Sequence, residues 1–133
     1  MGCTKTFATL CIASKDIHSD EITTILGVFS TETRPIDRSS KYKNRRGHHC
    51  WFFSTKFLSR SLDNAEHLQL LLKTLNGKSK ELELLRRRGC ILDIFCRWDS
   101  DGQGGFNLTT DLMKQLLEYG LEVTWDIYFD SDS

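Results

Sequence analysis

The chain has 133 residues, the size of one ordinary globular domain, and we expect a single domain spanning residues 1–133. Its 18 Lys and Arg residues balance 18 Asp and Glu residues, which excludes a globally basic nucleic-acid binder. Only one Pro and 39% hydrophobic residues exclude a disordered or collagen-like chain. No apolar run reaches the roughly 18 residues of a transmembrane helix. Residues 1–14 do not show the charged region followed by an apolar block that is typical of a signal peptide. We therefore expect a cytoplasmic protein without membrane contact.

The cysteines favour free thiols over disulfides. Their number is odd, and no two of them form a Cys-x-x-Cys pair. If Cys90 and Cys96 share a strand, about 20 Å separates them, which no disulfide spans. The five positions are Cys3, Cys11, Cys50, Cys90 and Cys96.

The first half of the chain predicts a strand, a short helix and a long loop. Residues 6–14 alternate as in a strand that is buried on both faces. One face of this strand would carry Phe7, Thr9, Cys11 and Ala13. Residues 18–21 supply a helix cap and acidic first-turn residues, and Gly27 supplies a left-handed stop. The apolar residues in 28–50 recur with neither the period of a helix nor that of a strand, which predicts a long loop with at most an edge strand at 28–30.

Residues 51–58 return to a period of two and predict a strand. Its apolar face would carry Trp51, Phe53, Thr55 and Phe57. Asp63 and Glu66 have the spacing of a capping box, and the helix that they begin would end at Gly77. A second helix is expected over residues 78–88.

The C-terminal part predicts two strands around a helix. Residues 91–98 form the first of these strands, and the helix begins after Thr109 or Thr110 and ends at Gly120. The last strand, residues 121–130, has the clearest alternation in the chain. One of its faces would carry Glu122, Thr124, Asp126, Tyr128 and Asp130, and the other is apolar.

This order of elements predicts an α+β fold. We expect a two-layer sandwich in which helices cover one face of a mixed, mostly antiparallel sheet, with a core that is ferredoxin-like in part.

Four short segments carry a resemblance to a known family. They are Ile-Thr-Thr-Ile-Leu-Gly at residues 22–27, Trp51 after a basic loop, Gly104-Gly105 with Leu108, and Asp-Ile-Tyr-Phe at residues 126–129. With these segments in this order, the chain resembles a bacterial domain-of-unknown-function family, number 4279, over nearly its whole length. The resemblance implies a cytosolic bacterial α+β domain and assigns no catalytic residue.

The sequence favours a protein that is not an enzyme. A calcium-loop pattern is incomplete because its twelfth position falls on Thr110 instead of the required Glu. The five positions that do match this pattern are Asp99, Asp101, Gln103, Gly104 and Asn107. His48 and His49 would point to opposite faces of a strand, and no nucleophile has a recognisable base. We therefore expect no catalytic residue, metal or cofactor.

Charge is distributed unevenly along the neutral chain. Residues 34–60 carry eight basic residues and one Asp, a net charge of +7, and residues 99–133 carry eight acids and one Lys, a net charge of −7. In the folded protein, either the two segments lie together and neutralise one another, or one of them binds a partner of opposite charge.

The acidic segment leads to our main functional hypothesis. We expect it to bind a cationic protein partner, with the domain acting as an immunity protein that neutralises a nuclease-type toxin by occlusion. The residues predicted to bind this partner are Asp99, Asp101, Glu122, Asp126, Tyr128 and Asp130.

The basic segment leads to the alternative, a nucleic-acid or nucleotide-binding regulatory domain. Here the neighbouring aromatic residues Trp51, Phe52 and Phe53 would stack on bases. The residues predicted to bind nucleic acid are Arg34, Lys43, Arg45, Arg46 and His48.

Overall fold

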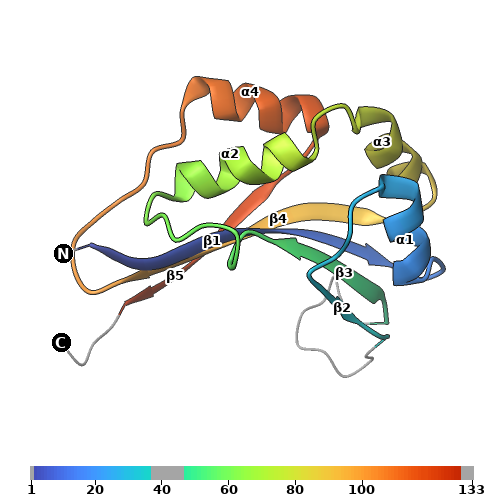
Figure 1. Ribbon diagram of the computed structural model, residues 1–133, viewed down its shortest axis with the longest axis horizontal. Helices are drawn as coiled ribbons and strands as arrows, with labels where there is room; N and C mark the ends of the chain where they lie inside the picture. The colour runs from blue at the N-terminus through green and yellow to red at the C-terminus, as the bar shows by residue number, and fades with distance from the viewer. Residues whose placement is uncertain (1, 37–46, 130–133) are drawn as a thin grey trace.

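The structure is a computed structural model that describes residues 2–36 and 47–129. These residues form one five-stranded sheet and four helices (Figure 1). In chain order the elements are β1 (Cys3–Ser14), α1 (Ser19–Leu26), β2 (Glu32–Arg34), β3 (His49–Ser54), α2 (Asn64–Thr74), α3 (Ser79–Arg87), β4 (Ile91–Ser100), α4 (Thr110–Tyr119) and β5 (Val123–Phe129).

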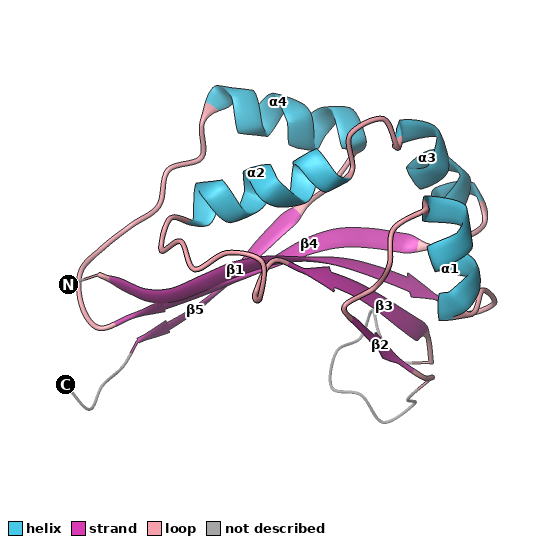
Figure 2. Ribbon diagram, in the orientation of Figure 1, coloured by secondary structure: helices cyan, strands magenta, loops and turns pink. Residues whose placement is uncertain are grey.

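The strand order is β2-β3-β1-β4-β5. The first four strands pair antiparallel throughout, as two interleaved β-α-β units do in ferredoxin-like folds. Helix α4 then returns the chain to the start of β5, which pairs parallel to β4. All four helices lie on one side of the sheet (Figure 2). The expected two-layer α+β sandwich with a mixed, mostly antiparallel sheet is therefore confirmed.

The central strand β1 separates the two faces of the sheet. Ala8, Leu10 and Ile12 point toward the helices and are buried in the main core. Cys11 and Ala13 point to the opposite face, where they pack with Phe52 and other residues in a smaller cluster. The alternation expected for this strand is confirmed, because successive side chains of a strand point to opposite faces.

Local signals set the ends of two helices as expected. The side chain of His18 accepts a hydrogen bond from the backbone N–H of Asp20 at the start of α1, and Gly27 ends this helix with a φ of 73°. The hydroxyl of Thr109 accepts from the N–H of Leu112 at the start of α4, and Gly120 ends it with a φ of 65°. Glycine adopts such positive φ values without steric cost.

Several predicted boundaries differ from the structure, and three of them concern the edge strand, the end of β3 and the end of α2. The edge strand lies at Glu32–Arg34 rather than at residues 28–30, since its backbone pairs with β3. Strand β3 ends at Ser54, because a turn follows in which the Leu58 and Ser59 N–H groups bond to the Thr55 carbonyl. Phe57 is consequently 90% exposed and lies outside the strand. Helix α2 ends at Thr74, before Gly77.

Asn64, the first residue of α2, connects the helix layer to three strands. Its side-chain oxygen accepts a hydrogen bond from the Trp125 indole N–H at 2.9 Å. Its amide donates to the Thr6 hydroxyl at 2.9 Å, and that hydroxyl donates to the Arg97 carbonyl at 2.7 Å. Asn64 and Thr6 are both buried, so each of these polar groups depends on the others for its hydrogen bonds.

We expect Asn64→Ala to lower the free energy of unfolding by about 2 kcal/mol, because it leaves the Trp125 N–H without its acceptor and the Thr6 hydroxyl without its donor. Urea denaturation measures this change. The control is Glu118→Ala on the exposed side of α4, which should change stability by less than about 0.5 kcal/mol. Equal stability of the two variants would contradict the role given to Asn64.

Candidate functional site on the open face of the sheet

The face of the sheet that carries no helix brings together charged and aromatic side chains from β4 and β5. In the parallel register, Arg97 lies opposite Asp126 and Asp99 lies opposite Tyr128. Because alternate residues of a strand share a face, all four side chains lie on the same side of the sheet. We call these four residues, Arg97, Asp99, Asp126 and Tyr128, the open-face cluster.

Arg97 lies at the centre of this cluster. Its Nε is 2.6 Å from Oδ1 of Asp99, and its Nη2 is 3.4 Å from Oδ2 of the same carboxylate. The guanidinium carbon lies 3.8 Å from the centre of the Tyr128 ring, a cation–π contact. The Tyr128 hydroxyl in turn donates to Oδ2 of Asp126 at 2.7 Å. Each side chain of the cluster is therefore held by another one.

The electrostatics of the cluster are mixed rather than purely acidic. The hydrogen bond to Asp99 raises the pKa of Arg97 above its already high ordinary value, so the guanidinium stays charged. The negative charge of Asp99 is therefore neutralised by Arg97 on the same strand, and Lys5 lies opposite Asp99 on β1. Asp126 forms no salt bridge with any described residue. Of the two carboxylates in the cluster, Asp126 is therefore the one that can form a salt bridge with a cationic group of another molecule.

The structure brings together only part of the predicted acidic surface. Asp99, Asp126 and Tyr128 belong to the open-face cluster. Asp101 lies in the loop after β4, where its Oδ1 accepts a hydrogen bond from the Gly2 N–H at 2.9 Å. Glu122 is exposed just before β5, at the other end of the strand pair. Asp130 lies outside the described residues.

Arg97 was not among the predicted site residues. The signal that could have found it is the spacing of Arg97 and Asp99, which places opposite charges on one face of a predicted strand. What the sequence does not contain is the register of β4 against β5, which sets Arg97 beside Asp126 and Tyr128.

The predicted nucleic-acid surface is represented by two described residues. Arg34 on β2 pairs with Glu32 at 2.7 Å and lies over the Phe52 ring, 5.5 Å from its centre. His48 is buried. The other three predicted residues, Lys43, Arg45 and Arg46, lie outside the described part of the chain.

Trp51, expected as a stacking residue in the nucleic-acid hypothesis, is part of the core. Its side chain has no exposed surface, and its indole N–H donates to the Thr23 hydroxyl at 2.9 Å. It faces the helices, whereas bases would stack on the open face. Trp51 therefore stabilises the packing of α1 on β3 and is not available to a base.

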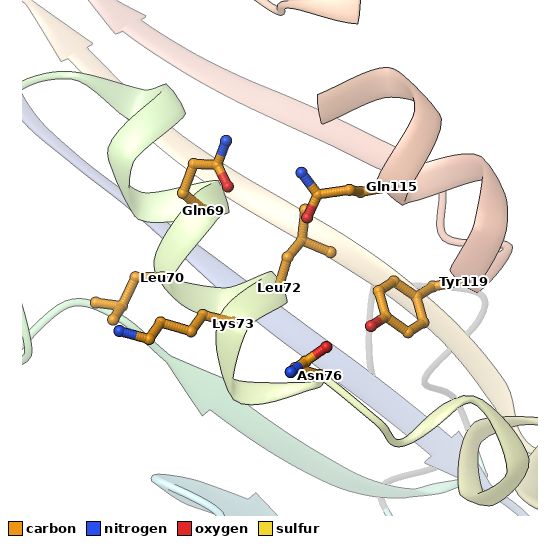
Figure 3. Close-up of a pocket in the computed structure, with 7 residues that line it drawn as sticks. All are labelled: Gln69, Leu70, Leu72, Lys73, Asn76, Gln115 and Tyr119. Atoms are coloured by element: carbon orange, nitrogen blue, oxygen red, sulfur yellow. The ribbon is translucent and has the colours of Figure 1, made fainter. Parts of the chain in front are cut away.

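A groove of about 370 Å³ lies between α2 and α4 (Figure 3). Gln69 and Gln115 lie on its two sides, from α2 and α4. Its full lining is Gln69, Leu70, Leu72, Lys73, Asn76, Gln115 and Tyr119. No Ser, Cys, His or carboxylate contributes to this lining, and its ionisable side chains are Lys73 and Tyr119.

The described histidines serve local structure. The His18 and His49 rings lie 5.2 Å apart, and His18 caps α1. His67 is fully buried between the Thr55 hydroxyl at 2.6 Å and the Ser61 carbonyl at 2.8 Å. Within residues 2–36 and 47–129, no three His, Cys, Asp or Glu side chains are placed to hold one metal ion. No helix in this part of the chain is long and apolar enough to cross a membrane.

The sequence profile described as "Domain of unknown function (DUF4279)" matches residues 4–130. The chain belongs to this family. The match covers every element of the DUF4279 fold from β1 to β5 and agrees with the resemblance carried by the four short segments. No curated protein and no solved structure matches the chain.

The cysteines of this DUF4279 domain lie in settings that disfavour a reactive thiolate. Burial raises the pKa of Cys96 to about 12, and it also raises the pKa of Cys90 above its ordinary value. Both side chains are buried beneath the helices in the main core. A thiol that stays protonated at neutral pH is a poor nucleophile.

We expect Cys96 to resist alkylation by iodoacetamide in the folded protein at pH 8, because the thiolate form is scarce and the side chain is enclosed. Peptide mapping by mass spectrometry locates the label. The same reaction in urea serves as the control and should label Cys96 fully. Labelling of the folded protein at the rate seen in urea would contradict this assignment.

Proposed function

We propose that this DUF4279 domain is a non-enzymatic binding protein that neutralises a cationic, nuclease-type toxin by covering it with the open-face cluster. The observation that carries the proposal is the fixed geometry of Tyr128. Its ring lies against the Arg97 guanidinium at 3.8 Å, and its hydroxyl is hydrogen-bonded to Asp126. An exposed aromatic side chain is thus held in one orientation before any partner binds.

Tyr128 has the properties of an interface anchor. It is 45% exposed although both its ring and its hydroxyl have partners within the protein. Tyr and Arg are the residue types that, with Trp, dominate the binding energy of protein interfaces. Because the side chain is already oriented, docking it costs little conformational entropy.

Asp126 gives the proposed surface its preference for a cationic partner. It accepts a hydrogen bond from Tyr128 but forms no salt bridge with a described residue, so its carboxylate can pair with a Lys or Arg of the partner. Asp101 and Glu122, at the two ends of the β4–β5 pair, add negative charge that would steer such a partner. Occlusion requires only a fixed surface of this kind and no chemical step.

The direct test uses the product of the gene adjacent to the one that encodes this chain, mixed with the protein and followed by size exclusion and calorimetry. We expect a complex that Asp126→Lys weakens about tenfold or more, since the change places like charges together. The matched control is Glu118→Lys, the same charge change on α4 at the helix side of the sheet. This control should leave the affinity unchanged.

Three results would overturn the proposal. They are the absence of a complex, equal effects of Asp126→Lys and Glu118→Lys, and a failure of the protein to protect cells from the partner's toxicity. A fourth would favour the nucleic-acid alternative: binding of a single-stranded oligonucleotide that weakens steeply with salt and is indifferent to Asp126→Lys.

A further inference from the structure

Strand β5 forms one edge of the sheet, and no strand of residues 2–36 or 47–129 lies along its outer side. The Ile94 N–H on β4 donates to the Glu122 carbonyl at 2.8 Å, so the backbone of residue 122 points toward β4. N–H and C=O groups alternate between the two sides of a strand. The outward groups are therefore those of Val123, Trp125, Ile127 and Phe129.

These outward backbone groups have no hydrogen-bond partner among the described residues. The edge also carries exposed apolar side chains, since Ile127 is 43% and Phe129 is 69% exposed. Natural edge strands are usually blunted by shortness, charge, Pro or a bulge. β5 is seven residues long, contains neither Pro nor a bulge, and carries one charged side chain, Asp126.

The opposite edge shows what a protected edge looks like in the same sheet. β2 has only three residues, and Pro35 follows it directly. Glu32 and Arg34 place charges on two of its three positions. An added strand would gain few backbone hydrogen bonds at β2 and a full row of them at β5.

The two faces of β5 specify the chemistry of an added strand. On the open face, the carboxylates of Glu122 and Asp126 flank Thr124, and Tyr128 follows. On the helix face, the row is apolar, with Trp125, Ile127 and Phe129. A neighbouring strand that complements both rows alternates Lys or Arg on one face with apolar residues on the other.

A second copy of this chain does not meet that requirement. Antiparallel pairing of two complete β5 strands, residues 123–129, places Asp126 of one copy opposite Asp126 of the other. Like charges directly opposite each other destabilise strand pairs. The charge pattern of the edge therefore favours a cationic strand from a different protein.

We infer that β5 is a docking edge on which the partner adds a strand of alternating basic and apolar residues as a sixth strand of the sheet. This inference rests on the proposed function and specifies how the cationic partner is held. Backbone hydrogen bonds to the odd-numbered residues of β5 supply affinity, and the alternating side chains supply specificity. The open-face cluster then lies beside the added strand and contacts its basic side chains.

The probe is a short synthetic peptide in which Lys alternates with Val, compared with a peptide of the same composition in scrambled order. Strand addition predicts that the alternating peptide binds about tenfold more tightly, because only it satisfies both faces of the edge. It also predicts slower hydrogen exchange at the outward amides of Val123, Trp125, Ile127 and Phe129 in the complex. Equal affinity of the two peptides, or unchanged exchange at these amides, overturns the inference.

Two variants of the protein separate the backbone contribution from that of the side chain. Ile127→Pro removes one outward N–H and leaves the N–H groups that bond to β4, so it should weaken binding about tenfold. Ile127→Ala keeps this N–H and should bind more tightly than the proline variant. Thermal melting reports whether the proline variant is folded, and the exchange measurement on the unmodified protein decides the question if it is not.

The same variants distinguish failure of this inference from failure of the proposed function. If Asp126→Lys abolishes binding of the adjacent gene's product while Ile127→Pro leaves it unchanged, the edge is not the docking site and the proposed function stands. If neither substitution matters to that partner, both are wrong. Concentration-dependent dimers that protect the outward amides without peptide would also overturn the inference, in favour of a second copy.

Discussion

Parallel pairing of β5 with β4 determines which side chains meet on the open face. The register sets Asp126 beside Arg97 and Tyr128 beside Asp99, which brings the Tyr128 ring against the Arg97 guanidinium. The Arg97–Asp99 ion pair forms within β4 and the Tyr128–Asp126 hydrogen bond within β5, so the register joins two pairs that each strand already holds. A shift of β5 by one residue would turn Asp126 and Tyr128 toward the helices. On the other side of the same strand, Trp125 is fixed by Asn64, which resists such a shift.

The cluster combines a charge balance with rigidity. Arg97 removes most of the negative charge of Asp99 and in return orients Tyr128, so the surface is less acidic than the net charge of −7 in residues 99–133 implies. A surface that attracted cations by charge alone would bind many of them weakly and lose them with salt. Ordered anchors beside one carboxylate without a salt bridge, Asp126, offer selectivity instead, which the proposed occlusion of one partner requires.

Much of the fold could be predicted from the sequence because its signals are local. The cap at His18 and the stop at Gly27 lie next to the helix that they delimit. The alternation in β1 and β5 follows from the geometry of a strand, whose successive side chains point to opposite faces of the sheet. β2 was misplaced because only pairing with β3 defines it. The candidate site shows the same division. The alternation of residues 121–130 placed Asp126 and Tyr128 on one face of a strand, as the structure has them. Arg97 was missed because the sequence of a single strand does not determine its register against a neighbouring strand.

The central claim is that Arg97 orients Tyr128 for binding, and a double-mutant cycle between these two residues tests it most directly. Affinity for the adjacent gene's product is measured by calorimetry for the unmodified protein, Arg97→Met, Tyr128→Leu and the double variant. We expect a coupling energy of about 1 kcal/mol or more, because either substitution removes the cation–π contact by which Arg97 orients the Tyr128 ring. Strictly additive effects of the two substitutions would contradict it.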